Sequence, residues 1–135
     1  MKKRLSIDLQ QDLKKDLLKV KTDSLVIGVN EGRVLNPIST KIDKATKGVI
    51  KKLAKRKEFE GKVGQQAYIA SPEGMSAERL YLIGFGKSKD SLSSEDLDKI
   101  LNSIINSIKS SKSKNVSICF PSLKYSNDSN NDSWF

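Results

Sequence analysis

Histidine is absent from the 135 residues, and cysteine occurs once. Without histidine, the chain cannot build a Ser-His-Asp or Cys-His nucleophile system or a histidine-containing zinc site. A single cysteine excludes an intramolecular disulfide and a cysteine-rich metal site, and it suits a reducing, cytoplasmic location. No apolar run reaches the roughly 18 residues of a membrane span, and the basic N-terminus lacks the apolar core of a secretory signal. We therefore expect a cytoplasmic protein with no membrane partner.

Apolar residues are also few, at 36% of the chain, whereas charged residues make up 30%. A chain of this length is sufficient for one domain with its own core. We predict a single domain over residues 1–125. The polar, low-complexity stretch at 126–133 cannot bury enough surface to offset its ordering entropy, so residues 126–135 are expected to form a loop or tail.

Apolar runs and alternating patterns predict five strands. They cover residues 4–9, 24–29, 65–71, 79–83 and 116–120. Residues 10–23 are predicted as a short helix or a loop. The turn at 72–74 joins two of the strands directly, so we expect an antiparallel pair there and a mixed sheet.

Two helices are predicted between these strands, which favours an α/β fold with helices on both faces of the sheet. The first covers residues 41–57, where apolar side chains recur on one face and Gly48 interrupts the pattern. The second begins at Ser93, which resembles a capping-box residue because Asp96 follows three positions later. Its apolar stripe runs from Leu97 to Ile108 at helical spacing.

The net charge of +9 is concentrated in the first of these helices. Residues 41–57 hold eight lysines and arginines and one aspartate. Most charge runs are solvated surfaces, but this one is lopsided enough to be a candidate for binding DNA or another polyanion through phosphate neutralisation. No aromatic residues lie among the cations, so base stacking is not indicated. The candidate residues are Lys44, Lys47, Lys51, Lys52, Lys55 and Arg56.

Gly84, Gly86 and Lys87 follow a predicted strand and form a weaker candidate, a phosphate-binding loop. The dinucleotide fingerprint needs a third glycine where Lys89 stands, and the P-loop pattern needs a glycine where Tyr81 stands. An ordinary turn is the better interpretation of these glycines.

No residues are assigned to catalysis or to metal binding. Asp96 and Asp98 lie at the start of a helix, where acids interact favourably with the helix dipole. Cys119 alternates with apolar neighbours on a predicted strand, which is typical of a buried or half-buried thiol.

Four segments, in this order and at this spacing, carry a resemblance to a known family. They read GVNEG at 28–32, IDKATKG at 42–48, FEGKVGQ at 59–65 and ERLYLIGFGK at 78–87. Residues 22–87 thereby resemble the N-terminal domain of the leucyl (cytosol) aminopeptidases, a family of metallopeptidases. The resemblance implies a macro-domain-like, three-layer α/β/α sandwich with a mixed sheet. It also implies a chain that is truncated before the last helix of that domain.

In that family the N-terminal domain is not catalytic. It precedes a larger C-terminal domain that binds two divalent metals, usually Zn or Mn, and removes N-terminal amino acids from peptides, and the enzymes are typically homo-hexamers. The catalytic motif NTDAEGRL is missing from this sequence. The resemblance therefore implies a domain without a cofactor of its own that serves assembly or regulation, with the catalytic domain as its partner.

Two alternatives from other classes remain. The basic helix predicts DNA or polyanion binding, which can coexist with a role in an aminopeptidase. The macro-domain-like fold suggests nucleotide or ADP-ribose binding, an analogy that rests on the fold alone.

Overall fold

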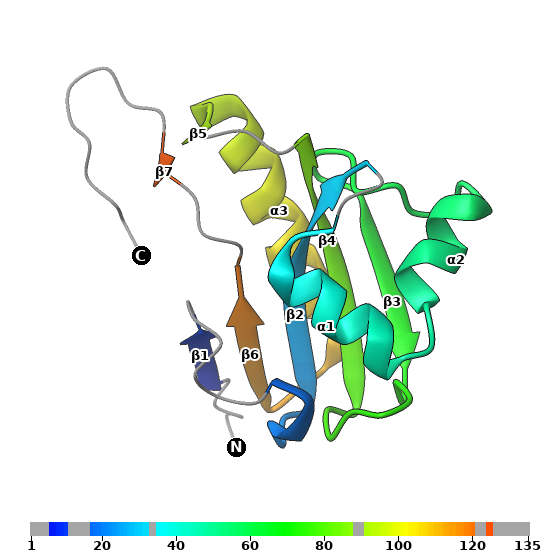
Figure 1. The fold of residues 1–135 in the computed structure, drawn as a ribbon. Coiled ribbons are helices and arrows are strands. Elements are labelled where there is room, and N and C mark those ends of the chain that lie inside the picture. Colours follow the sequence, from blue (N-terminus) through cyan, green and yellow to red (C-terminus); the bar gives the residue numbers. More distant parts are fainter. Residues whose placement is uncertain (1–5, 11–16, 33–34, 88–90, 121–123, 126–135) are drawn as a thin grey trace.

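The computed structural model describes residues 6–10, 17–32, 35–87, 91–120 and 124–125. Strands and helices alternate along most of this chain (Figure 1). The strands are β1 (Ser6–Gln10), β2 (Ser24–Glu31), β3 (Gln66–Ala70), β4 (Arg79–Lys87), β5 (Ser91–Leu92), β6 (Asn115–Cys119) and β7 (Lys124–Tyr125). The helices are the 3-10 turn η1 (Leu17–Lys19), α1 (Pro37–Ala45), α2 (Val49–Lys55) and α3 (Ser94–Ser111).

Five strands form one sheet in the order β1-β6-β2-β4-β3. The β1–β6, β6–β2 and β2–β4 pairs are parallel, whereas β3 and β4 are antiparallel. The prediction of a mixed sheet with an antiparallel pair around residues 72–74 is confirmed. The two-residue strands β5 and β7 pair separately.

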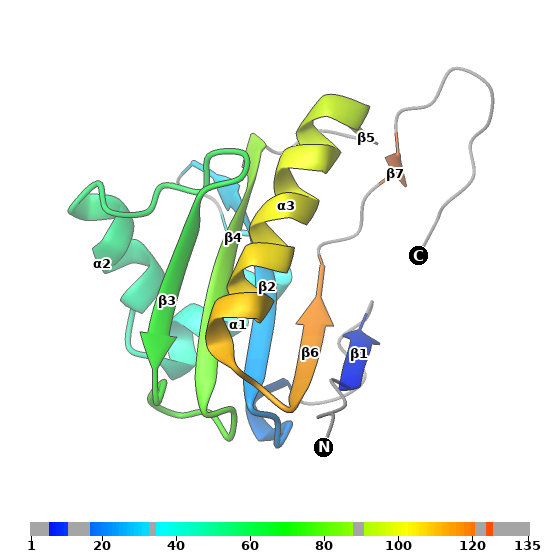
Figure 2. The same cartoon turned by 180° about the vertical axis from the view of Figure 1, so that it is seen from behind.

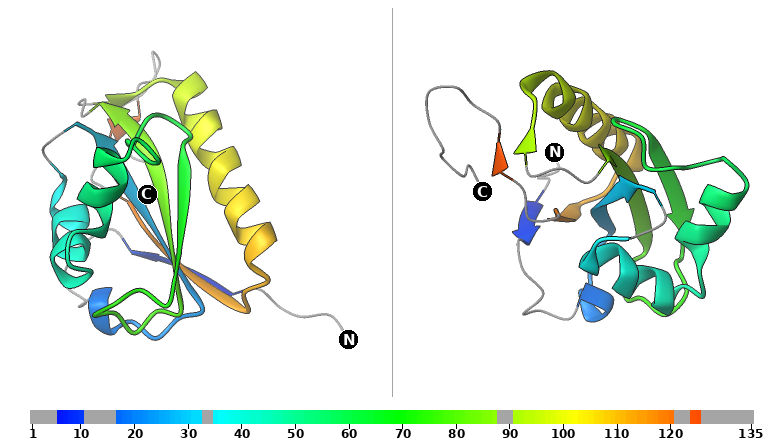
Figure 3. Two further views of the ribbon diagram at one scale, coloured as in Figure 1. Left: turned by 90° about the vertical axis from the view of Figure 1, so that its right-hand side faces the viewer. Right: turned by 45° about the horizontal axis from the view of Figure 1, so that its top comes forward.

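Helices cover both faces of this sheet. Helices α1 and α2 lie on one face and α3 on the other, as the left view of Figure 3 shows from the side. Seen from behind in Figure 2, α3 crosses in front of β4 and β2. The predicted three-layer α/β/α sandwich is therefore confirmed.

Side-chain alternation along the central strands divides the apolar residues between two cores. Leu25 and Ile27 of β2, with Leu82 of β4, pack toward α1 and α2. Val26 of β2 and Ile83 of β4 belong to the second core, beneath α3. All five side chains are fully buried. Because both faces are covered, these strands consist of continuous apolar runs rather than alternating apolar and polar residues.

Helix α1 begins at Pro37, four residues before the predicted start at residue 41, because Asn36 and Pro37 form an N-terminal cap. The side chain of Asn36 accepts the backbone N–H of Ser39 at 2.8 Å. Pro37 occupies the first turn, where a missing N–H costs nothing.

The prediction of one continuous helix over 41–57 is wrong. Lys47 and Gly48 both adopt positive φ, at 61° and 85°, so the chain leaves the helical conformation after α1 and re-enters it as α2. A left-handed residue cannot continue a right-handed helix, and glycine adopts that conformation at least cost. Gly48, which the sequence placed inside the helix, is the residue that separates two helices.

Strand β4 is longer than predicted. The expected strand ends at residue 83, with a turn at Gly84 and Gly86, but β4 continues through Lys87. In contrast, the cap of α3 is confirmed, because the Ser93 hydroxyl accepts the N–H of Asp96 at 3.1 Å. The expectation for residues 126–135 lies outside the described residues.

Candidate functional site

The basic candidates on α1 and α2 all project into solvent. Each of the six predicted polyanion-binding side chains is exposed. They lie on both helices and on the turn between them: Lys44, Lys47, Lys51, Lys52, Lys55 and Arg56. We call this set the basic surface.

Few acids neutralise the basic surface. Lys47 forms an ion pair of 3.1 Å with Glu73. Within the described part of the chain, the other five members form no ion pair. As far as the described residues show, solvent and salt compensate these five charges, as expected of a surface that exchanges counterions for phosphates.

A buried carboxylate fixes the position of α2 and hence of much of the basic surface. Gly48 is the N-cap of α2 and offers no side chain to the first free amides. Asp43 of α1, only 5% exposed, takes this role instead. Its Oδ1 accepts the backbone N–H of Ile50 at 2.9 Å and that of Lys51 at 3.2 Å.

The glycines of the weaker candidate lie in a strand rather than in a phosphate-binding loop. The N–H of Gly84 donates to the carbonyl of Gln65 at 2.7 Å, and the N–H of Gly86 donates to that of Gly61 at 2.8 Å. A Cβ at Gly84 would collide with the Lys62 carbonyl. The two glycines thus let the 61–65 segment pack against β4, and their amides are already used within the fold.

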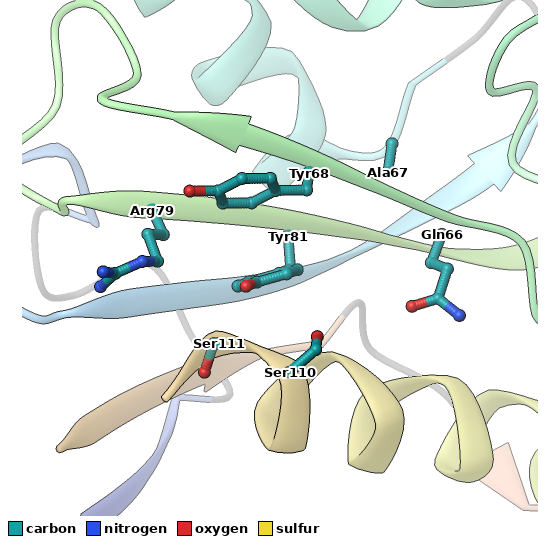
Figure 4. A pocket seen from close by; sticks show the side chains of 7 residues that line it. All are labelled: Gln66, Ala67, Tyr68, Arg79, Tyr81, Ser110 and Ser111. Carbon is teal, nitrogen blue, oxygen red and sulfur yellow. The ribbon is translucent and has the colours of Figure 1, made fainter. Parts of the chain in front are cut away.

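A pocket on the α3 face of the sheet was not anticipated from the sequence. It has a volume of about 310 Å³ and lies between the β3–β4 pair and the last turn of α3. Tyr68 and Tyr81 stack across the two strands, with ring centroids 5.0 Å apart. Figure 4 shows Arg79 beside the hydroxyl ends of both rings. The other residues that line this pocket are Gln66, Ala67, Ser110 and Ser111.

Burial raises the pKa of the Tyr81 phenol, and the neighbouring Tyr68 raises it further. The Ser111 hydroxyl and the Arg79 guanidinium oppose this shift in pKa because they stabilise the phenolate. The net effect is a pKa above that of an ordinary tyrosine, so the Tyr81 phenol ionises only in strongly alkaline solution.

A second cavity, of about 270 Å³, opens at the carboxyl end of β2. Val29, Ile50 and Phe59 form part of its largely apolar wall, and Asn30 and Lys51 supply polar groups. Carboxyl ends of parallel strands are common ligand sites in α/β folds. Asn30 is also engaged in the fold, since the side chain of Asn36 donates to its Oδ1 at 2.9 Å.

Comparison with known proteins shows the family to which this chain belongs. The model of the cytosol aminopeptidase family, N-terminal domain, matches residues 26–134. The chain belongs to this family. A probable cytosol aminopeptidase of Cupriavidus metallidurans is 39% identical over 85 residues, which cover 63% of this chain and 17% of the relative. The cytosol aminopeptidase of Pseudomonas aeruginosa is 36% identical over 90 residues, or 67% of this chain and 18% of the relative.

This aminopeptidase-type N-terminal domain also resembles solved structures in its fold. A mutant of tomato leucine aminopeptidase superposes with a TM-score of 0.61 at 16% identity, covering 93% of this chain and 34% of that one. The macrodomain of Mycobacterium tuberculosis DarG superposes with a TM-score of 0.59 at 18% identity, covering 82% and 74%. The macro-domain-like fold is thereby confirmed.

The residues described in this N-terminal domain do not fit a metal centre. Among them, no three His, Cys, Asp or Glu side chains gather closely enough to hold an ion. Nor is any helix in the described ranges long and apolar enough to cross a membrane. Cys119 is fully buried, as predicted.

Proposed function

We propose that this chain acts as the non-catalytic N-terminal domain of a cytoplasmic leucyl aminopeptidase and that it serves assembly or regulation of the catalytic part. The supporting observation is the family match over residues 26–134, set against relatives of which the chain spans only 17–18%. The catalytic domain, its two divalent metals (Zn or Mn) and a homo-hexameric assembly belong to this proposal.

A chimera tests the proposal. In the Pseudomonas aeruginosa cytosol aminopeptidase, the matching N-terminal segment is either deleted or replaced by this chain. Light scattering after gel filtration measures assembly, and release of p-nitroaniline from leucine p-nitroanilide with Mn²⁺ measures activity. We expect the deletion to lose assembly and the chimera to restore it, while the isolated chain hydrolyses nothing.

Either of two results would overturn this function. One is a chimera that assembles no better than the deletion. The other is hydrolysis by the isolated chain, with added Zn²⁺ or Mn²⁺, in proportion to its concentration.

We propose DNA binding as a second candidate function, supported by the five cations of the basic surface that pair with no acid among the described residues. Binding to labelled duplex DNA is measured across a salt series. Each phosphate contact contributes about 0.9 to the slope of log affinity against log salt, so losing four contacts lowers the slope by up to about 3.6. The test variant replaces four cations with Gln: Lys51, Lys52, Lys55 and Arg56.

A matched control keeps the change in net charge but moves it to the opposite layer. It replaces four exposed lysines on and just after α3 with Gln: Lys99, Lys109, Lys112 and Lys114. The proposal expects the control to retain most of the slope. Equal slopes in both variants would show that binding depends on net charge and not on the basic surface. No binding at low salt would overturn the DNA-binding function and leave only the proposed assembly role.

A further inference from the structure

Strand β3 is one of the two edge strands of the sheet, opposite β1, and one of its sides has no neighbouring strand among those described. Among the described strands it pairs with β4 only. The left view of Figure 3 looks onto this edge, with α2 on one side and α3 on the other. A free strand edge presents a row of backbone donors and acceptors that a further strand can pair with.

The register shows which backbone groups point outward. The N–H of Gly84 donates to the carbonyl of Gln65, and the N–H of Ser71 donates to the backbone carbonyl of Glu78 across the same ladder. Backbone groups alternate in direction along a strand, so the odd-numbered residues of this segment bond to β4. The N–H and C=O groups of Gln66, Tyr68 and Ala70 therefore point to the open edge.

This edge lacks the features that normally prevent strand addition. Within β3 there is no proline, no charged residue and no left-handed residue that would form a bulge. Its three outward-facing residues also have exposed side chains, and Tyr68 is 52% exposed, an unusual value for a large aromatic ring. Natural edge strands are blunted by such features when pairing is harmful, so this strand is open to a partner.

The charges around the edge select the kind of partner. Arg79 lies directly opposite Ala70 on β4. Its side chain is 34% exposed and lines a surface hollow together with Ala70 and Tyr68 of the edge strand. Its ion pair with Glu78 is long, at 3.8 Å, and solvent-exposed, so it holds the guanidinium weakly. On the other face, α2 stands beyond the β3 edge in Figures 1 and 2, and it carries exposed Lys51 and Lys55.

We propose that the β3 edge binds an extended acidic peptide segment by strand addition, with an acidic side chain opposite Ala70 that pairs with Arg79 and an apolar one that packs on Tyr68. A strand laid along Gln66, Tyr68 and Ala70 gains main-chain hydrogen bonds from the edge and side-chain specificity from the pocket beside it. A second copy of this chain would bring the same cations to the same edge, and like charges oppose that pairing. The inference goes beyond the assembly role and does not depend on it.

The probe is a fluorescein-labelled peptide, Thr-Glu-Glu-Val-Glu-Thr-Thr, capped at both ends. Antiparallel to β3, it places its first Glu opposite Ala70 and its Val opposite Tyr68. Anisotropy at low salt measures its affinity for the full 135-residue chain. We expect Arg79→Gln to weaken binding by about tenfold, because one charge-assisted contact is lost.

Proline at position 70 tests strand addition itself. Ala70→Pro removes an outward N–H and leaves the β3–β4 ladder intact, and proline is tolerated on edge strands in that orientation. We expect it to weaken binding by about tenfold. Ala70→Ser keeps the N–H, so it should bind within about twofold of the wild type. Circular dichroism and Tm establish that each variant is folded.

Three results would overturn the proposal. The first is equal binding by wild type and Ala70→Pro. The second is equal affinity for a control peptide with Gln in place of every Glu. The third is a dimer seen by analytical ultracentrifugation without peptide and abolished by Ala70→Pro, which would assign the edge to a second copy of the chain.

Discussion

Asp43→Ala is expected to be among the most damaging single changes near the basic surface. The carboxylate is buried and accepts the N–H groups of Ile50 and Lys51, which no residue of α2 itself can satisfy. Leaving a buried donor without a partner costs about 1–3 kcal/mol, and the Lys51 amide is only partly buried. We therefore expect the free energy of unfolding to fall by about 2–3 kcal/mol.

For a domain of this size, that loss corresponds to a fall in Tm of roughly 6–12 °C, measured by calorimetry or circular dichroism. Asp43→Asn is the matched control, because its amide oxygen can still accept both bonds without the charge. It should lose about 1 kcal/mol. A Tm for Asp43→Ala within about 1 °C of wild type would refute this account of how α2 is held, as would equal losses in the two variants.

Three further predictions concern other parts of the fold. Gly84→Ala should yield little soluble protein on expression, because its Cβ would collide with the Lys62 carbonyl. Gly48→Ala places its Cβ in open space and should cost only about 1 kcal/mol of stability for its positive φ, measured by thermal melts. The pKa of Tyr81 is higher in the folded chain than in the unfolded chain, so its contribution to folding stability is complete below the pKa of unfolded tyrosine and is lost as the pH rises above about 10. Ultraviolet titration should show one tyrosine that ionises late, and Tyr81→Phe should remove that signal. Calorimetry with ADP-ribose should give no heat, because the amides of Gly84 and Gly86 are already bonded within the fold, and a saturable signal would contradict that expectation.

Local patterns were enough to predict the elements that depend on local chemistry. The apolar run at 24–29 and the stripe after Ser93 correspond to β2 and α3, and the capping residue was identified correctly. The alternation of strands and helices predicted helices on both faces of the sheet, and the family resemblance added the macro-domain-like version of that fold. The cations of the basic surface were also identifiable, because a charge-rich helix face is visible in the sequence.

The errors arose where a single residue or a distant contact decides the structure. The apolar pattern predicts a continuous helix over 41–57 because Gly48 costs only about 1 kcal/mol inside a helix. The break is stabilised by a contact that this pattern does not reveal, the buried Asp43 carboxylate that accepts the first amides of α2. The length of β4 depends on the 61–65 segment that packs on its glycines. The pocket between Tyr68 and Tyr81 depends on the β3–β4 register, which no local pattern specifies.

The position of β6 has a consequence for how the domain folds. This strand comes late in the chain but lies between β1 and β2, where Ser6 pairs with Asn115 and Ser24 with Val116. Among the described strands β1 pairs with β6 alone, so during synthesis it stays unpaired until β6 has emerged from the ribosome. Contacts this distant in sequence also slow refolding. We would expect nascent chains that stop before residue 115 to protect β2 and β4 from proteolysis well before they protect β1.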